Sequence, residues 1–548
     1  MGFPYSPRLA LLLLSLVTTA TAATCGRSLD DVETVHLSLS SQIVELSAGE
    51  NAEVLVTLET QKPLSAPIVL SVGGPADAAL PSGLQAAFDP VAATPAPDHP
   101  ATTRLRLTAT PTAVDDQYTL VVHGKGQFPA EMSSANLTVN LTGMATTWRR
   151  PISTPATEQL SWMAADRSGG VVVGLYTDGA LAGGQNQGAF DGYIMRYRSN
   201  GAVAWVQRLA TMSADIVACL AVDDAENVYV AGYTYGAFPG QASAGKADAY
   251  VAKLGPDGTL AWLRQFGTAE IDQLNAIAVG TDGSIYAAGL TEGAFPTQTS
   301  AGGSDVFVVK LRPDGSQEWL RQFGTDQKER TDAVPEDRSV ALTLDSAGDL
   351  YIVGSTQGTF AGETSAGLGD AFITRMDASG KQAWLHQFGS VSHDALLAVT
   401  PNPAGGVYAV GWAKGPVGNQ IQLGGQDALL VAYRPDGTRL FVRQLGTTYA
   451  DALEALTVYD GKLYVIGSTR GAFAGQSQAG VQDVFMMQLA SDGTTLWLRQ
   501  LGTPQFDRGT AVAATSDYLY VAGATFGAFE MGATPMGSDG FLQQYLRQ

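Results

Sequence analysis

Residues 229–268 read YVAGYTYGAFPGQASAGKADAYVAKLGPDGTLAWLRQFGT, and residues 286–325 repeat this wording as YAAGLTEGAFPTQTSAGGSDVFVVKLRPDGSQEWLRQFGT. The aromatic residue near the end of each copy recurs at spacings of 57, 57, 57, 65, 57 and 56 residues. These aromatic residues are Trp148, Trp205, Trp262, Trp319, Trp384, Phe441 and Trp497. The long spacing contains an eight-residue insertion within DQKERTDAVPEDR. A fixed period of this length indicates a repeat architecture with seven units.

Each unit contains four short runs typical of β-strands, which in the second unit are CLAVD, NVYVAG, DAYVAKL and LAWLRQFG. The turn between the last two runs carries a glycine, which supplies the positive φ angle that a tight hairpin needs. Four antiparallel strands repeated seven times predict a seven-bladed β-propeller. The last unit ends at FLQQYLRQ without its fourth strand. The strand around Trp148 is therefore predicted to complete that unit and to close the ring.

The repeats resemble the bacterial β-propeller repeat family labelled SBBP, whose wording is AVDxxGNVYVAGxT followed by DAYVAKLxPDGxLxW. The resemblance covers residues 146–548 and recurs in register seven times. It implies a seven-bladed propeller in a secreted or surface protein, and it implies little about chemistry.

Residues 30–144 alternate apolar and polar residues in short runs such as VHLSLS, AEVLVTLE and TRLRLTAT. Six or seven such runs predict an antiparallel β-sandwich. This stretch resembles the Ig-like domains of bacterial surface proteins. The predicted fold class is therefore all-β, with an Ig-like sandwich at 30–144 and a seven-bladed propeller of four antiparallel strands per blade at 146–548.

Residues 1–25 have the features of a signal peptide. Arg8 precedes the apolar run LALLLLSLV, which is too short to span a bilayer. The run AATC resembles a bacterial lipobox that ends at the lipidated residue Cys25, although Ala22 and Thr24 depart from its preferred residues. Ordinary cleavage after small residues is the alternative. Both readings predict an exported protein, either a lipoprotein of the outer membrane or cell surface, or an extracellular protein.

The charge balance limits the partners. The chain has 52 acidic and 32 basic residues, which gives a net charge of −20. Such a surface repels phosphate backbones, so nucleic acid is excluded as a partner. Two cysteines are too few for a disulfide framework. We expect a monomer that meets a protein or a glycan at the cell surface, and that touches the membrane only through a lipid on Cys25.

Acidic residues recur at two positions of every unit. An aspartate opens the third strand at Asp191, Asp248, Asp305, Asp370, Asp427, Asp483 and Asp539. An acid precedes the first strand at Glu158, Asp215, Asp272, Asp337, Asp394, Asp451 and Asp507. Clustered carboxylates suit Ca²⁺, so these aspartates are candidate metal ligands. Alternatively, each carboxylate accepts hydrogen bonds from its own loop and holds a turn in place.

The sequence offers no catalytic residue. The five histidines have no spacing typical of a metal site or of a catalytic group. The fifth unit departs most from the repeat, reading GWAKGPVGNQIQLGGQD with Trp412 and Lys414. These two residues are candidates for partner binding, and Trp412 either anchors a partner or fills the gap left by a missing Phe.

These features together predict a non-catalytic binding or scaffold protein of the bacterial envelope or surface, with an unknown ligand. One alternative is an envelope polysaccharide hydrolase or lyase that uses carboxylates on one face of the propeller. Another alternative is a calcium-stabilised adhesin.

Overall fold

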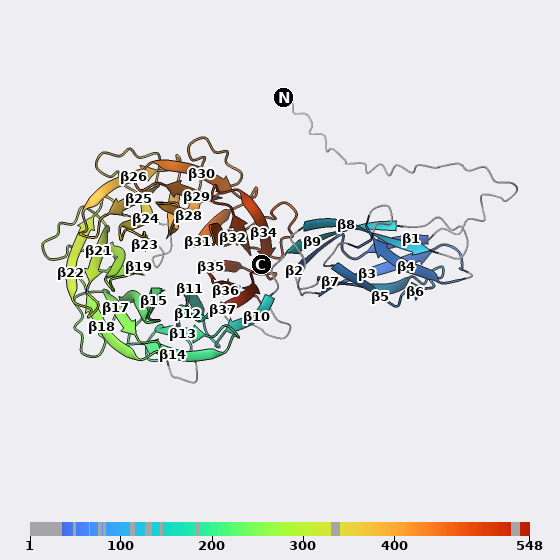
Figure 1. Cartoon of the computed structure of the whole chain (residues 1–548), viewed down its shortest axis with the longest axis horizontal. Helices are drawn as coiled ribbons and strands as arrows, with labels where there is room; N and C mark the ends of the chain where they lie inside the picture. Colours follow the sequence, from blue (N-terminus) through green and yellow to red (C-terminus); the bar gives the residue numbers. More distant parts are fainter. Residues whose placement is uncertain are drawn as a thin grey trace, which may run out of the picture.

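The structure is a computed structural model of the chain, and the regular elements that it describes are all β-strands (Figure 1). The described residues are 35–47, 51–64, 66–74, 79–80, 84–109, 116–125, 134–142, 146–181, 186–329, 340–527 and 538–547. The predicted signal peptide and Cys25 lie outside these ranges. The prediction of an all-β protein is confirmed.

The repeats form seven four-stranded antiparallel sheets, here called units one to seven in chain order. Units one to three contain β11 (Glu158–Ala165), β12 (Val171–Thr177), β13 (Asp191–Tyr197), β14 (Val203–Leu209); β15 (Asp215–Val222), β16 (Val228–Thr234), β17 (Asp248–Leu254), β18 (Leu260–Phe266); and β19 (Asp272–Val279), β20 (Ile285–Thr291), β21 (Asp305–Leu311), β22 (Gln317–Phe323). Units four to six contain β23 (Val340–Leu344), β24 (Leu350–Thr356), β25 (Asp370–Met376), β26 (Gln382–Phe388); β27 (Asp394–Pro401), β28 (Val407–Ala413), β29 (Asp427–Tyr433), β30 (Arg439–Leu445); and β31 (Asp451–Tyr459), β32 (Lys462–Thr469), β33 (Asp483–Leu489), β34 (Thr495–Leu501). Unit seven contains β35 (Asp507–Ala514), β36 (Tyr518–Thr525), β37 (Asp539–Leu546) and β10 (Thr146–Ile152).

The prediction of a single closed seven-bladed propeller is wrong for the described chain, whose strands form nine separate sheets, none of them closed or curled. No strand ladder crosses from one unit to the next within the described residues. Consecutive units are joined instead by side-chain packing and by isolated bridges such as Ala247 with Ile271. The seven units nevertheless follow one another around a common centre, with the first strand of each innermost (Figure 1).

Unit seven combines strands from opposite ends of the repeats. β10 pairs antiparallel with β37, from Thr146 opposite Tyr545 to Ile152 opposite Gly540. The prediction that the strand of Trp148 completes the last unit is therefore confirmed. This pairing covers the outer edge that β37 would otherwise expose.

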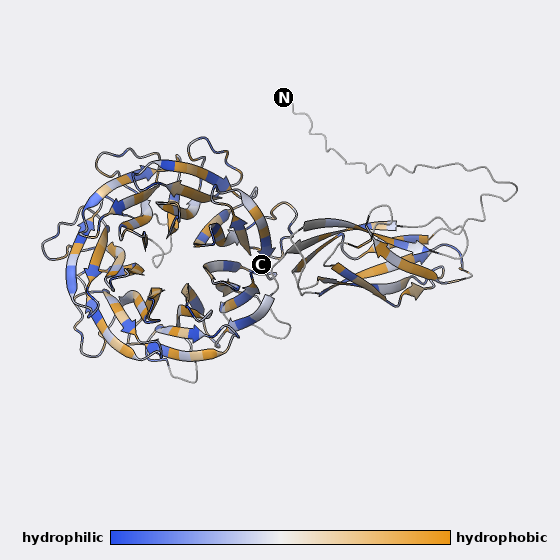
Figure 2. Cartoon of the chain, in the orientation of Figure 1, coloured by the Kyte–Doolittle hydropathy of each residue, from blue (hydrophilic) through white to orange (hydrophobic). Residues whose placement is uncertain are grey.

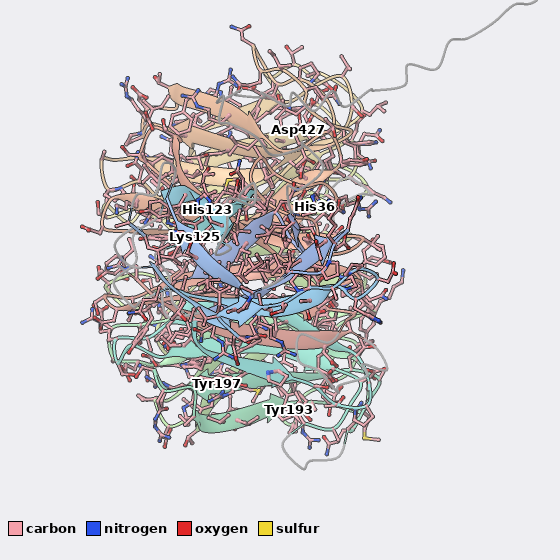
Figure 3. The ribbon with its side chains drawn as sticks, turned by 90° about the vertical axis from the view of Figure 1, so that its right-hand side faces the viewer. His36, His123, Lys125, Tyr193, Tyr197 and Asp427 are labelled. Atoms are coloured by element: carbon pink, nitrogen blue, oxygen red, sulfur yellow. The ribbon has the colours of Figure 1, made fainter. Side chains whose placement is uncertain are left out.

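The core of the repeats lies between neighbouring units. The middle strands are apolar on both faces, and β16 and β21 are buried at every residue. One cluster joins Tyr229 of unit two with Leu274 and Phe307 of unit three. In unit one, Tyr193 and Tyr197 on β13 are buried in the same way (Figure 3). Apolar residues run along the strands of every unit (Figure 2), because each unit buries both faces of its sheet.

The outermost strands connect neighbouring units through tryptophan. An indole Nε1–H donates to a carbonyl oxygen in the last turn of the following unit, 2.9 to 3.2 Å away. These pairs are Trp148 with Ser199, Trp205 with Pro256, Trp262 with Pro313, Trp319 with Ala378, and Trp384 with Pro435. A β-carbon on Gly258, whose φ is +84°, would lie 2.7 Å from the Trp205 ring. The glycine therefore provides both the turn conformation and the space for the ring.

Residues 35–142 form the two remaining sheets around one apolar cluster that both sheets share. One sheet has the order β1 (Val35–Leu39), β3 (Asn51–Thr60), β7 (Ala101–Ala109), β5 (Leu84–Asp89); the other has β2 (Ile43–Ser47), β9 (Ser134–Thr142), β8 (Asp116–Lys125), β4 (Ile68–Gly73), β6 (Ala92–Ala93). β2 runs parallel to β9, whereas a fully antiparallel sandwich was predicted. The Ig-like assignment stays a prediction.

Candidate functional site

The acid predicted to precede the first strand is the first residue of that strand in every unit but the fourth. In all seven units the acid is buried and hydrogen-bonded to a hydroxyl residue four positions earlier. Asp272 is fully buried, and its Oδ2 accepts from the Thr268 N–H at 2.5 Å and from the Thr268 hydroxyl at 3.0 Å. The same arrangement links Asp215 to Thr211, Glu329 to Thr325, Asp394 to Ser390, Asp451 to Thr447, and Asp507 to Thr503. These carboxylates therefore hold the turns that lead into the units.

The aspartate that opens the third strand holds the preceding loop. Asp248 Oδ2 accepts from the Ala244 N–H at 2.9 Å and from Gln265 Nε2 at 2.8 Å. The same two kinds of donor serve Asp305, Asp370, Asp427 and Asp483. Asp427, which is labelled in Figure 3, is the first residue of β29. The glutamine amides thus bind the aspartate of their own unit.

The two kinds of acid meet in pairs where consecutive units adjoin. A β-carbon on Gly267 would lie 2.5 Å from Asp248 Oδ1 and 2.7 Å from Asp272 Oδ2, so these oxygens are at most about 5.2 Å apart, the sum of those distances. Corresponding carboxylates meet in Asp191 with Asp215, Asp305 with Glu329, Asp370 with Asp394, Asp427 with Asp451, Asp483 with Asp507, and Asp539 with Glu158. We call these seven arrangements the carboxyl pairs.

Burial and mutual repulsion both favour the protonated state of the carboxyl pairs. The pKa of Asp394 rises to about 6 through burial and, less strongly, through the nearby Asp370 carboxylate. The pKa of Glu329 rises to about 8 through burial and, less strongly, through Asp305. Asp248, Asp305 and Asp370 each have a buried Oδ1 that accepts no hydrogen bond in the structure. A proton shared within a pair would satisfy such an oxygen.

The prediction of Asp337 as the acid of unit four is not supported by the pairing, because Glu329 takes that role between units three and four and Asp337 lies outside the described residues. Glu329 is fully buried, and its Oε1 accepts from the Thr325 N–H at 2.7 Å. The insertion therefore follows the acid instead of preceding it. A constant interval identifies the right residue, since Asp248 to Asp272 and Asp305 to Glu329 both span 24 positions.

The first junction replaces two residues of the common pattern. Arg208 occupies the position of Gln265, and its Nη1 lies 3.4 Å from Asp191 Oδ2. Ala210 occupies the position of Gly267. A cation is thus built into one carboxyl pair, whereas the other pairs with an equivalent glutamine have a neutral amide at that place.

A calcium site remains a prediction. The structure brings Asp248 together with Asp272, Asp370 with Asp394, and the other candidate ligands into pairs as described above. Across the part of the chain that the structure describes, no group of three or more His, Cys, Asp or Glu residues is placed to hold a metal ion.

A cavity of about 610 Å³ lies where units five, six and seven depart from the repeat. Trp412 and Lys414 of unit five both line this cavity. Trp412 is only 4% exposed and packs against Leu397 and Ala452, while Lys414 Nζ lies 5.3 Å from the centre of its ring. Trp412 therefore fills a gap beneath Lys414, and its ring face is not open to a partner.

Two arginines and a glutamate complete this cavity, which we call the cationic pocket. Arg470 is exposed, and its Nε lies 3.3 Å from Gln482 Oε1. Arg508 donates to both oxygens of the buried Glu454, at 3.0 and 2.9 Å. Sequence reasoning missed Arg470, Arg508 and Glu454. The signal was present, because unit two has Tyr235, Ile216 and Ala218 at the equivalent positions.

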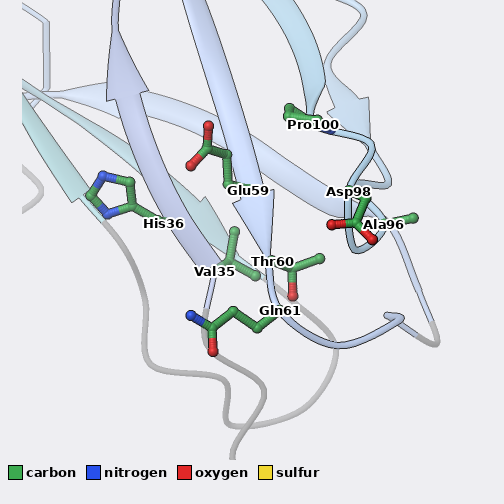
Figure 4. A pocket seen from close by; sticks show the side chains of 8 residues that line it. All are labelled: Val35, His36, Glu59, Thr60, Gln61, Ala96, Asp98 and Pro100. Atoms are coloured by element: carbon green, nitrogen blue, oxygen red, sulfur yellow. The ribbon is translucent and has the colours of Figure 1, made fainter.

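A second cavity, of about 640 Å³, lies in the first part of the chain (Figure 4). His36 and Glu59 line it from paired positions on β1 and β3, and both side chains are exposed. Asp98 contributes from a turn at a φ of 62°. These side chains are exposed on strands and a turn, so the cavity is not treated as a candidate ligand site.

Among the described residues, none of the structure's elements is a helix of the length and hydropathy needed to cross a bilayer. Protein-family models give no match to the chain. The regulatory protein FlaEY of Caulobacter vibrioides is 24% identical over 418 residues, which cover 67% of this chain and 42% of the relative. The chain thus spans less than half the length of that relative.

The solved structures that resemble the chain have low TM-scores. The rhamnogalacturonan lyase YesX is 11% identical, covers 94% of this chain and 90% of its own, and has a TM-score of 0.33. The SrpA adhesin of Streptococcus sanguinis is 9% identical, covers 34% of this chain and 94% of its own, and has a TM-score of 0.20. These likenesses support no argument about fold or function. The comparisons therefore assign the chain to no family, and the resemblance to SBBP repeats stays a prediction.

Proposed function

We propose that the chain is an exported, non-catalytic binding protein of the bacterial envelope that presents its repeats to a glycan or protein ligand. One observation carries this proposal. The acids common to the units are buried and bound to their own loops, as in Asp248 and Asp272, whereas the accessible charged groups of the cationic pocket occur only where the repeat breaks. A residue that recurs in every unit is needed for the structure of the unit itself, whereas a ligand site is found where the units differ.

Export and a lipid on Cys25 are parts of the same proposal. A Cys25→Ser variant separates the two modes of export. If Cys25 carries the lipid, the variant leaves the membrane fraction and loses labelling by a fatty acid. If cleavage is ordinary, the variant and the parent chain fractionate alike.

The binding function is tested with the full chain lacking its first 25 residues, immobilised and exposed to a panel of envelope polysaccharides. Saturable binding with unchanged polymer length supports a binding protein. Shortening of any polymer contradicts the non-catalytic assignment, and absence of binding across the panel contradicts a glycan as the ligand.

A hydrolase or lyase is favoured by one observation. Asp451 lines the cationic pocket, and burial raises its pKa, as a general acid requires. The same rise occurs in the other pairs, however, and Asp451 Oδ2 already accepts from the Thr447 N–H at 2.6 Å. If this residue were catalytic, Asp451→Asn would abolish any shortening of a polymer, while Asp507→Asn would leave it unchanged.

A further inference from the structure

We propose that the cationic pocket binds an acidic sugar, a hexuronic acid residue of a glycan, through Arg470 and Lys414. This inference rests on the binding function proposed above and names its site and ligand class. The chain has a net charge of −20, and yet three cationic side chains line this one cavity, against the two buried carboxylates of Glu454 and Asp451.

The charges of the pocket are incompletely balanced. Arg508 is neutralised by Glu454 in a two-pronged ion pair at 2.9 to 3.0 Å. Among the described residues, no carboxylate lies within 4.0 Å of the Lys414 ammonium or the Arg470 guanidinium. Within the described ranges, the partners of the Arg470 guanidinium are an amide oxygen at 3.3 Å and the Phe506 ring 5.9 Å away. A planar guanidinium in this situation fits a carboxylate with two parallel hydrogen bonds.

The remaining polar groups suit hydroxyls. Ser468 lines the pocket with a buried Oγ that has no hydrogen-bond partner in the structure. The amides of Gln426 and Gln482 line the same cavity, and each donates only a long bond, of 3.4 or 3.3 Å, to a backbone carbonyl. An orphaned hydroxyl and two weakly engaged amides are partners for a ligand with several hydroxyl groups.

The same features favour a sugar over an acidic peptide. The one aromatic side chain of the pocket, Trp412, is buried beneath Lys414 and offers no apolar surface for a peptide side chain. A volume of about 610 Å³ lies within the usual range for small-ligand sites. Arg470 is therefore assigned to the sugar carboxylate, with Lys414 as the second cation, and Ser468 and Gln482 to the ring hydroxyls.

The test uses isothermal titration of the full chain lacking residues 1–25 with three probes: D-glucuronate, D-glucose and N-acetylglutamate. We expect glucuronate to bind at least about tenfold more tightly than either of the others, and Arg470→Gln to remove about that factor. Arg264→Gln is the matched control, because it removes the same charge from an arginine that lies over Trp262 in unit two. It is expected to leave the affinity unchanged.

The outcomes separate the inference from the proposed function. Equal binding of glucuronate and N-acetylglutamate overturns the sugar assignment. Glucuronate binding that Arg470→Gln leaves intact overturns the pocket as its site. If the polysaccharide panel shows binding only to neutral polymers, the acidic-sugar inference fails while the binding function stands. If no polymer and no probe binds, both the inference and the glycan-binding function fail.

Discussion

The carboxyl pair of Asp370 and Asp394 leads to a prediction in which two similar substitutions have different effects. Below pH 3.8 the Asp394 carboxyl is protonated in the folded and the unfolded chain. Between pH 3.8 and 6 the unfolded chain releases this proton, while the folded chain retains it because its pKa is about 6. Stability therefore falls as the pH rises, by about 1.4 kcal/mol per pH unit and by about 3 kcal/mol in all, and the loss is complete above pH 6.

Asp370→Asn is expected to recover part of that loss. Asp370 Oδ2 accepts from the Ala366 N–H at 2.9 Å and from Gln387 Nε2 at 2.7 Å, so the amide oxygen must stay at that position. The new amide nitrogen then replaces Oδ1 and faces Asp394. It removes one charge and donates a hydrogen bond, so we expect a gain of about 1 to 2 kcal/mol at pH 8 and little change at pH 5.

Asp394→Asn removes the same charge without this benefit. The Ser390 N–H lies 2.5 Å from Asp394 Oδ2, so the amide oxygen must remain there. An acceptor then faces the Asp370 Oδ1 acceptor, and no proton can be shared. We expect no gain at pH 8 and a loss of about 1 kcal/mol or more at pH 5.

The assay is urea unfolding followed by far-UV circular dichroism at pH 5 and pH 8, with the midpoint and slope compared for each variant. Asp377→Asn is the control, since this half-buried aspartate lies in a turn of the same unit, and an asparagine side-chain oxygen can keep the hydrogen bonds that Oδ1 accepts from the Ser379 and Lys381 N–H groups. It should change stability little at either pH. If Asp370→Asn is no more stable at pH 8 than Asp394→Asn, the shared-proton reasoning is refuted.

Three further predictions concern the junctions and turns. Adding 5 mM Ca²⁺ after EDTA should leave the unfolding temperature unchanged if protons hold the pairs, and an upward shift that Asp248→Asn abolishes would make them cation sites. Gln265→Arg should be tolerated, because Arg208 occupies that position in unit one. Gln265→Glu should lower the free energy of unfolding by about 3 kcal/mol or more at pH 8, because it adds a third acid beside the carboxyl pair. Equal stabilities of the two variants in urea unfolding would contradict this prediction. Gly258→Ala should lower the free energy of unfolding by about 1 to 3 kcal/mol more than Gly240→Ala. Both glycines have positive φ angles, so that cost is common to the two variants, but only Gly258 has an aromatic ring within 4 Å of the added β-carbon. A thermal melt of both variants measures the difference.

Much of the strand pattern was accessible from the sequence because it is repeated. The Asp that opens each third strand marks the first residue of β17, β21 and β25, as the repeats indicate. The incomplete last unit also predicted the pairing of β10 with β37. The separation into nine sheets was not predicted, because strand spacing alone does not show whether ladders continue between units.

The candidate site was predicted less well. Trp412 stood out as an anomaly, yet its burial depends on Leu397 and Ala452, which belong to different units. The carboxyl pairs likewise depend on contacts between residues of neighbouring units. Arg470 and Arg508 come together only because units six and seven adjoin, and single-unit comparison cannot show this.

The ladder between β10 and β37 has a mechanical consequence. Thr146 lies opposite Tyr545 and Ile152 opposite Gly540, so the chain segments that continue beyond Thr146 and Leu546 leave from the same end of the ladder. A pulling force on these two segments would load the hydrogen bonds one after another, as a zipper opens, and the bonds would resist it one at a time. A force transmitted from residues 35–142 to a ligand in the cationic pocket also enters at Thr146, but β10 continues along the chain into β11, so the packed interfaces between units, where many contacts share the load, also carry it. The molecule is therefore expected to resist tension through its ligand better than tension through its ends.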